Sequence, residues 1–160
     1  MKTKIIIFCA FLGLVSCQLK KENPVSNKDS EKVIIEQKIR NTIEWGFGKD
    51  TTLLYSIIAN DEDFLEVHPG DRVVKGITEF RKAEKFWLDP RFKVKECKIW
   101  DMKIQLSKDG TVAWFFCRLN DIGEWDGQPT SWENTRWTGV LEQREGQWRM
   151  VQQHFSFASE

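Results

Sequence analysis

Histidine and cysteine are scarce in this chain, which has two His and four Cys among 160 residues. A zinc site needs three or four such ligands, and the part expected to fold contains only the two histidines and two separated cysteines, Cys97 and Cys117. Neither Ser156 nor Cys117 stands in a motif such as a nucleophile elbow. We therefore expect no metal site, no cofactor and no nucleophilic catalysis.

The formal net charge is zero, because Lys plus Arg and Asp plus Glu both number 24. Proteins that bind nucleic acid present a strongly basic face to the phosphates. The chain also lacks a glycine-rich phosphate loop, a heptad array and an internal repeat. This composition argues against nucleic-acid, nucleotide and coiled-coil functions.

The apolar run near the N-terminus, Ile5–Val15, is 11 residues long, whereas a membrane span needs roughly 20. Lys2 and Lys4 precede the run, and Leu14-Val15-Ser16-Cys17 follows the pattern of a bacterial lipobox. Its resemblance to lipoprotein signals implies cleavage before Cys17 and lipid attachment to that cysteine. An ordinary secretory signal is the alternative.

We accordingly predict three segments: a signal peptide at 1–16, a lipidated flexible tether at 17–30, and one folded domain at 31–160. The protein would be held in the cell envelope by the lipid on Cys17. Gln18 is not the aspartate that retains some lipoproteins at the inner membrane, so the outer membrane is favoured.

The spacing of apolar residues predicts helices first and strands afterwards. Asp50 is placed to cap the second of three helices, and a hairpin turns at Pro69-Gly70-Asp71. The expected helices are 30–47, 50–58 and 78–87, and the expected strands are 63–68, 72–74, 92–106, 111–122, 131–143 and 147–157. This order indicates an α+β fold in which a curved, mainly antiparallel sheet wraps the first helix.

A three-residue loop after Ser107 would place Cys117 opposite Asp101, with Cys97 four residues further along its strand. The separation is then on the order of 13 Å, and a disulfide needs Cα atoms within roughly 7 Å. Cys97 and Cys117 are expected to be free thiols unless a bulge or a second subunit intervenes.

The C-terminal strands also carry a family resemblance. The element order resembles the nuclear transport factor 2-like, or SnoaL-like, cone, and the last 45 residues are similar to the association (hub) domain of calcium/calmodulin-dependent protein kinase II. The resemblance implies self-assembly through the sheet and a side pocket lined by arginines. Gln152 stands where the hub pattern usually has a second histidine, so a homodimer is expected rather than a ring. The residues that carry the hub resemblance are Arg118-Leu119, Asp126-Gly127-Gln128-Pro129, Ser131, Glu133, Thr135-Arg136-Trp137, Arg144, Gly146, Trp148, Val151, His154 and Ser156.

Strand register can be taken independently. A three-residue loop at Arg144-Glu145-Gly146 places Arg136 opposite His154, and the same assumption at the previous hairpin places Arg118 opposite Trp100. These four residues form the predicted ligand-binding pocket, and a carboxylate would suit the guanidinium fork. Salt bridges to Glu133, Glu142 or Asp101 are the alternative for the arginines, and a core histidine hydrogen-bonded to the backbone is the alternative for His154.

Three functions remain open. The first is a lipid-anchored module that binds a small anionic or amphipathic molecule in the cone. The second is an isomerase, cyclase or hydratase, for which Asp61 or Asp63 could reach the pocket mouth. The third is an assembly module whose dimer interface is the convex face, expected to bear Trp137, Leu141, Val151 and Phe155.

Overall fold

The computed structural model describes residues 24–158, so the predicted signal peptide and the lipid-attachment residue Cys17 lie outside the described residues. The long helix α1 (Pro24–Gly48) begins six residues before the expected start at Ser30. Its buried side is formed by Ile35, Ile39, Thr42 and Trp45, which recur every three or four residues and face the core.

A short helix, α2 (Thr51–Tyr55), follows α1 and begins at the predicted cap. The Leu53 amide donates to Asp50 Oδ1 at 2.9 Å, which satisfies one of the free N–H groups at the helix start. No helix in the described part of the chain is both long and apolar enough to cross a membrane.

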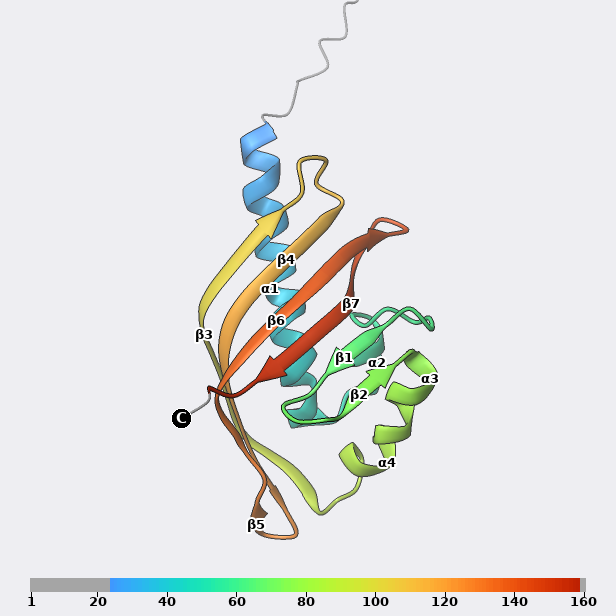
Figure 1. Cartoon of the computed structure of the whole chain (residues 1–160), viewed down its shortest axis with the longest axis vertical. Helices are drawn as coiled ribbons and strands as arrows, with labels where there is room; N and C mark the ends of the chain where they lie inside the picture. The colour runs from blue at the N-terminus through green and yellow to red at the C-terminus, as the bar shows by residue number, and fades with distance from the viewer. Residues whose placement is uncertain (1–23, 159–160) are drawn as a thin grey trace, which may run out of the picture.

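The sheet is mixed and strongly curled, and it wraps around α1 (Figure 1). Its main path runs in the order β2-β1-β7-β6-β4-β3, with the short β5 pairing with β4. All pairs are antiparallel except β1 with β7. The strands are β1 (Leu65–Val67), β2 (Val73–Lys75), β3 (Phe92–Leu106), β4 (Val112–Trp125), β5 (Gln128–Pro129), β6 (Trp132–Arg144) and β7 (Gln147–Ser156). The predicted α+β class and the curved sheet around the first helix are confirmed.

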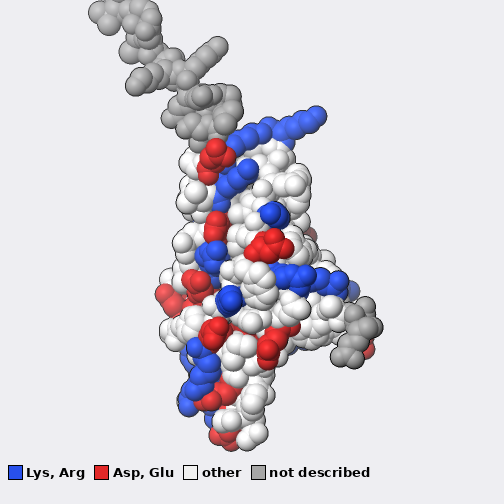
Figure 2. Space-filling view, turned by 90° about the vertical axis from the view of Figure 1, so that its left-hand side faces the viewer, with Lys and Arg blue, Asp and Glu red and all other residues white. Residues whose placement is uncertain are grey.

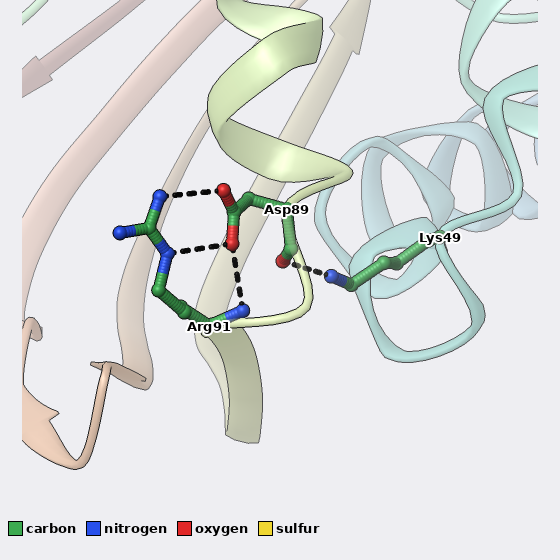
Figure 3. A network of polar contacts seen from close by, with 3 residues as sticks. All are labelled: Lys49, Asp89 and Arg91. Atoms are coloured by element: carbon green, nitrogen blue, oxygen red, sulfur yellow. Dashed lines mark hydrogen bonds and ion pairs between the residues drawn. The ribbon is translucent and has the colours of Figure 1, made fainter.

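The expected third helix is divided into three short turns: α3 (Ile77–Phe80), η1 (Arg81–Ala83) and α4 (Glu84–Trp87). Figure 1 shows this segment beside the β1–β2 hairpin. The loop after α4 is tied to the end of α1, because Lys49 Nζ donates to the Asp89 carbonyl at 2.6 Å and Arg91 binds the Asp89 carboxylate through two nitrogens (Figure 3). The Lys49 bond joins this loop to the end of α1, and the Arg91 bonds stabilise the loop itself.

The β6–β7 turn has two residues rather than the expected three. Glu145 and Gly146 both have positive φ, 54° and 73°, which suits the tight turn that matches strand twist. A further register shift follows between Val140 and Leu141. Arg136 therefore pairs with Ser156, and the predicted pairing of Arg136 with His154 is wrong.

The two faces of the sheet are the reverse of those predicted. Trp137 and Leu141 are 0% exposed and Phe155 is 3% exposed, all within the core around α1, so they are not on an outer interface. Val151 lies at the register shift and is half-buried against the same core. Side chains alternate along each strand, so burying one set sends its neighbours to the other face.

A bulge in β3 also moves side chains between faces. Asp101 has φ of 51° and lies within the register shift between Trp100 and Lys103. Trp100 is opposite Arg118, as predicted, whereas Met102 packs against the core. A bulge reverses the alternation beyond it, which regular strand counting does not detect.

Cys97 and Cys117 are free thiols. Cys97 pairs with Asp121 and Cys117 pairs with Trp137, so the two do not face one another across a strand pair. Burial raises the pKa of both thiols to about 12. They are accordingly unreactive at neutral pH.

Charges of both signs are intermixed on the side of the molecule where β3 lies (Figure 2).

Within residues 24–158, His, Cys, Asp and Glu side chains form no group of three that could hold a metal ion.

Candidate functional site

A cavity of about 590 Å³ lies inside the curled sheet. It is bounded by the C-terminal half of α1, by the α3–α4 segment, and by inward-facing residues of β1, β4, β6 and β7. The volume falls in the range usual for small-molecule sites, which is roughly 300–1,000 Å³.

The walls of the cavity are largely aromatic. Phe80, Phe86 and Trp87 come from the helical segment, and Trp132 and Phe155 come from the sheet. The rings hold one another in place: Phe80 and Trp87 have centroids 5.0 Å apart, and Trp132 and Phe155 are 5.2 Å apart. Such surfaces suit a flat or apolar ligand body.

One polar group in the cavity is formed by Glu66, His68 and Gln153. The parallel pairing of β1 with β7 sets Glu66 beside Gln153, and Gln153 Nε2 donates to Glu66 Oε2. His68 Nε2 lies 2.5 Å from Glu66 Oε1, although the two are not aligned as a hydrogen bond. Gln153 is 3% exposed and its Oε1 has no hydrogen-bond partner among the described residues, so this lining residue holds a buried acceptor without a donor.

A second polar group is the carboxyl of Asp121 on β4, which also lines the cavity. No described residue makes a hydrogen bond or an ion pair with it. Burial raises its pKa to about 6, because a buried carboxylate loses the hydration that water gives it. Asp121 can therefore hold or release a proton near neutral pH.

Two cations complete the lining. Arg72 lies in the turn before β2, and Lys82 lies in η1. Both side chains are exposed, so they mark the edge of the cavity where it meets solvent.

Comparison with known proteins identifies the fold family. The family model described as a SnoaL-like domain matches residues 35–160. This chain belongs to the SnoaL-like family. No curated protein matches the sequence significantly.

Solved structures with the same fold include three with informative descriptions. A proposed scytalone dehydratase from Novosphingobium aromaticivorans is 11% identical, with 84% of this chain and 89% of that chain covered and a TM-score of 0.69. A proposed dehydratase of the nuclear transport factor 2-like family from Streptomyces avermitilis is 17% identical, with 83% and 99% covered and a TM-score of 0.67. A proposed calcium/calmodulin-dependent kinase II association domain from Exiguobacterium sibiricum is 8% identical, with 81% and 95% covered and a TM-score of 0.66. At these identities the likeness establishes the fold alone, and it agrees with the resemblance seen in the sequence.

The SnoaL-like domain brings Arg118 and Arg136 together as cross-strand neighbours, but not in the cavity. Arg118 Nη1 donates to Asn134 Oδ1 at 2.7 Å, and Arg136 Nη2 donates to the Phe157 carbonyl. Trp100 and His154 are also absent from the cavity lining. The predicted pocket of these four residues is wrong for the cone cavity, because their side of the sheet faces away from α1.

Of the residues expected at the dimer interface, Phe155 lines the cavity instead. Asp61, expected with Asp63 near the pocket mouth, forms an ion pair with Arg144, and neither Asp61 nor Asp63 lines the cavity.

Sequence reasoning missed Asp121, Glu66 and His68 in this SnoaL-like domain. The predicted strand at 63–68 put Glu66 and His68 on one face, which was a usable signal. Their approach to Gln153 depends on the parallel β1–β7 pairing between segments far apart in the sequence.

Proposed function

We propose that this protein binds a small, mostly apolar molecule in the cone cavity. The observation that carries the proposal is the aromatic lining around two polar groups, the carboxyl group of Asp121 and Oε1 of Gln153. Neither group has a hydrogen-bond partner among the described residues. A few convergent polar groups in an apolar cavity are typical of ligand sites, because they orient a ligand whose body is held by burial.

Native mass spectrometry of the full chain, purified without denaturation, tests the proposal by reading any co-purified small molecule. Ala83→Phe would fill the cavity from its helical wall, and we expect the bound mass to disappear. Lys108→Phe, at an exposed turn residue outside the cavity, is the matched control. Retention of the same mass in Ala83→Phe would contradict binding in the cone.

Self-association through the convex face is part of the same proposal. Trp114 is 44% exposed there, and it borders a shallow groove of about 420 Å³ together with Phe116 and Val140. Exposed apolar patches of this kind favour protein contacts. A homodimer would cover the patch with a second copy.

Sedimentation of Trp114→Glu tests the homodimer, and the expected species is a monomer. Leu88→Glu changes a similarly exposed apolar residue, 43% exposed, in the loop after α4 and should leave the dimer intact. A monomeric native protein at high concentration would rule the dimer out.

Membrane attachment through lipid on Cys17 is the third part of the proposal, and the lipobox supports it. Cells grown with a labelled fatty acid should incorporate label into the native protein but not into Cys17→Ser. Equal labelling of both proteins would argue against attachment at this cysteine.

A second candidate function is proton-transfer catalysis of the isomerase, cyclase or dehydratase type. It is favoured by Asp121, whose pKa of about 6 suits an acid or base near neutral pH, and by His68 in the same cavity. Two fold neighbours are named as proposed dehydratases.

Turnover of ketone, lactone and hydroxy-ketone panels tests the enzyme. Asp121→Asn would abolish turnover, because the amide cannot take up or release the proton. Undiminished turnover in Asp121→Asn would exclude Asp121 as the acid or base.

A further inference from the structure

The acidic residues that line the cavity are less exposed than the basic ones. The interior of the cavity contains the carboxyl groups of Glu66 and Asp121, and Glu66 is 5% exposed. Its edge has the exposed cations Arg72 and Lys82. An anion would be repelled by the inner carboxylates and attracted by the outer cations.

The two edge cations are available for a ligand. Neither the Arg72 guanidinium nor the Lys82 ammonium makes an ion pair or a side-chain hydrogen bond with any described residue. Other cations of the same region are engaged: Arg81 bonds to Glu84, and Arg91 bonds to Asp89.

The inner polar groups favour a neutral partner. Gln153 Nε2 is occupied by Glu66, which leaves Gln153 Oε1 as a buried acceptor without a donor. A buried acceptor of this kind gains from a hydroxyl or N–H donor and gains nothing from a carboxylate.

We propose that the ligand is an amphipathic organic anion that enters with its neutral end first. Its acid group stays at the edge, between Arg72 and Lys82. Its apolar body packs on the aromatic walls, and a hydroxyl or N–H group at the inner end reaches Gln153 Oε1. The inference rests on the proposed binding function and adds the class and the orientation of the ligand.

A pair of fluorescent probes separates the contribution of ligand charge to affinity from the contribution of apolar contact. The probes are 8-anilino-1-naphthalenesulfonate, an aromatic anion, and N-phenyl-1-naphthylamine, its neutral counterpart without the sulfonate. Both are titrated into the full chain at low and high salt. We expect the anion to bind more tightly than the neutral probe, and salt to reduce that advantage because exposed charges are screened.

The double variant Arg72→Gln/Lys82→Gln should reduce the affinity for the anionic probe by about tenfold and leave the affinity for the neutral probe unchanged. Lys75→Gln/Lys85→Gln removes the same charge from exposed residues of the same region that do not line the cavity, and it should change neither affinity. Ala83→Phe should reduce the binding of both probes.

Each alternative outcome has a distinct meaning. Equal binding of the two probes by the native protein, or an equal loss in the control variant, would overturn the orientation but leave the binding function standing. Failure of both probes to bind the native protein would overturn the binding function and the orientation with it.

Discussion

The concave and convex faces of β4 and β6 differ in how far their side chains are buried. The concave face buries Cys117, Leu119, Trp137 and Leu141, each 0% exposed. The convex face carries Arg118 and Arg136, and it leaves Trp114 44% exposed. One face stabilises the cone and forms the cavity, whereas the other is free for contacts with another molecule.

Replacing a tryptophan on each face is the strongest test of this difference. Trp137→Ala should cost about 3–5 kcal/mol of unfolding free energy, because it leaves a large hole in the core. Trp114→Ala should change the free energy by about 0.5 kcal/mol or less at protein concentrations where the protein is monomeric. Denaturant titration of both variants measures the two values, and similar losses would contradict the assignment of the faces.

Two glycines sharpen the same comparison. A Cβ at Gly139 would lie 2.6 Å from Phe115 Cε1 and 2.7 Å from the Gln152 carbonyl oxygen, so Gly139→Ala should cost about 1–3 kcal/mol through overpacking. Gly48 has no atom within 4 Å of the added Cβ, and Gly48→Ala should be neutral or slightly stabilising. Thermal denaturation compares the stability of the two variants. An unchanged melting temperature for Gly139→Ala would show that β4 and β7 can shift to make room for the added methyl group.

The carboxyl group of Asp121 makes stability fall as pH rises. Its folded pKa is about 6 against an ordinary 3.8, so the folded state holds the proton between these values while the unfolded state has released it. Asp121→Asn removes the charged form and should stabilise the protein by on the order of 2 kcal/mol at pH 8, with no gain attributable to ionisation below pH 3.8. Unfolding free energies at both pH values measure the difference, and Asp63→Asn, an exposed change outside the cavity, is the control. An equal gain in unfolding free energy at both pH values would show that the stabilisation does not come from the ionisation of Asp121.

The smallest effect is expected at the exposed Asp89–Arg91 pair. Hydrogen bonds from Arg91 lower the pKa of Asp89 from 3.8 to about 2, so the ionised carboxylate stabilises the folded state. Its contribution is complete above pH 3.8 and is lost as pH falls through about 2. Asp89→Asn should therefore lower the melting temperature slightly at pH 7 and converge with the native protein near pH 2. A deficit that stays constant over this range would show that the Asn side chain disturbs the loop by another route.

Local patterns were sufficient for the long elements of this fold, although they predicted one continuous helix where α3, η1 and α4 lie and did not predict β5. The Asp50 cap predicted the start of α2, and β3 occupies the expected residues 92–106. Alternation also showed that Arg118 and Arg136 belong to one face and that Trp137 and Leu141 belong to the other. The family resemblance in the order of helices and strands agreed with the match to the SnoaL-like family.

The sequence by itself determined the helices, the strands and the two side-chain sets of each strand, because these depend on neighbours a few residues apart. Only the tertiary structure decided which set meets α1. The bulge at Asp101 exchanges the faces along the C-terminal part of β3. In the β6–β7 hairpin the two-residue turn and the shift at Val140/Leu141 together move the register by two residues, which changes the partner of Arg136 but keeps Arg136 on the same face as His154. The parallel β1–β7 pairing likewise brought Glu66 to Gln153 across 87 positions of sequence, a contact that no local pattern records.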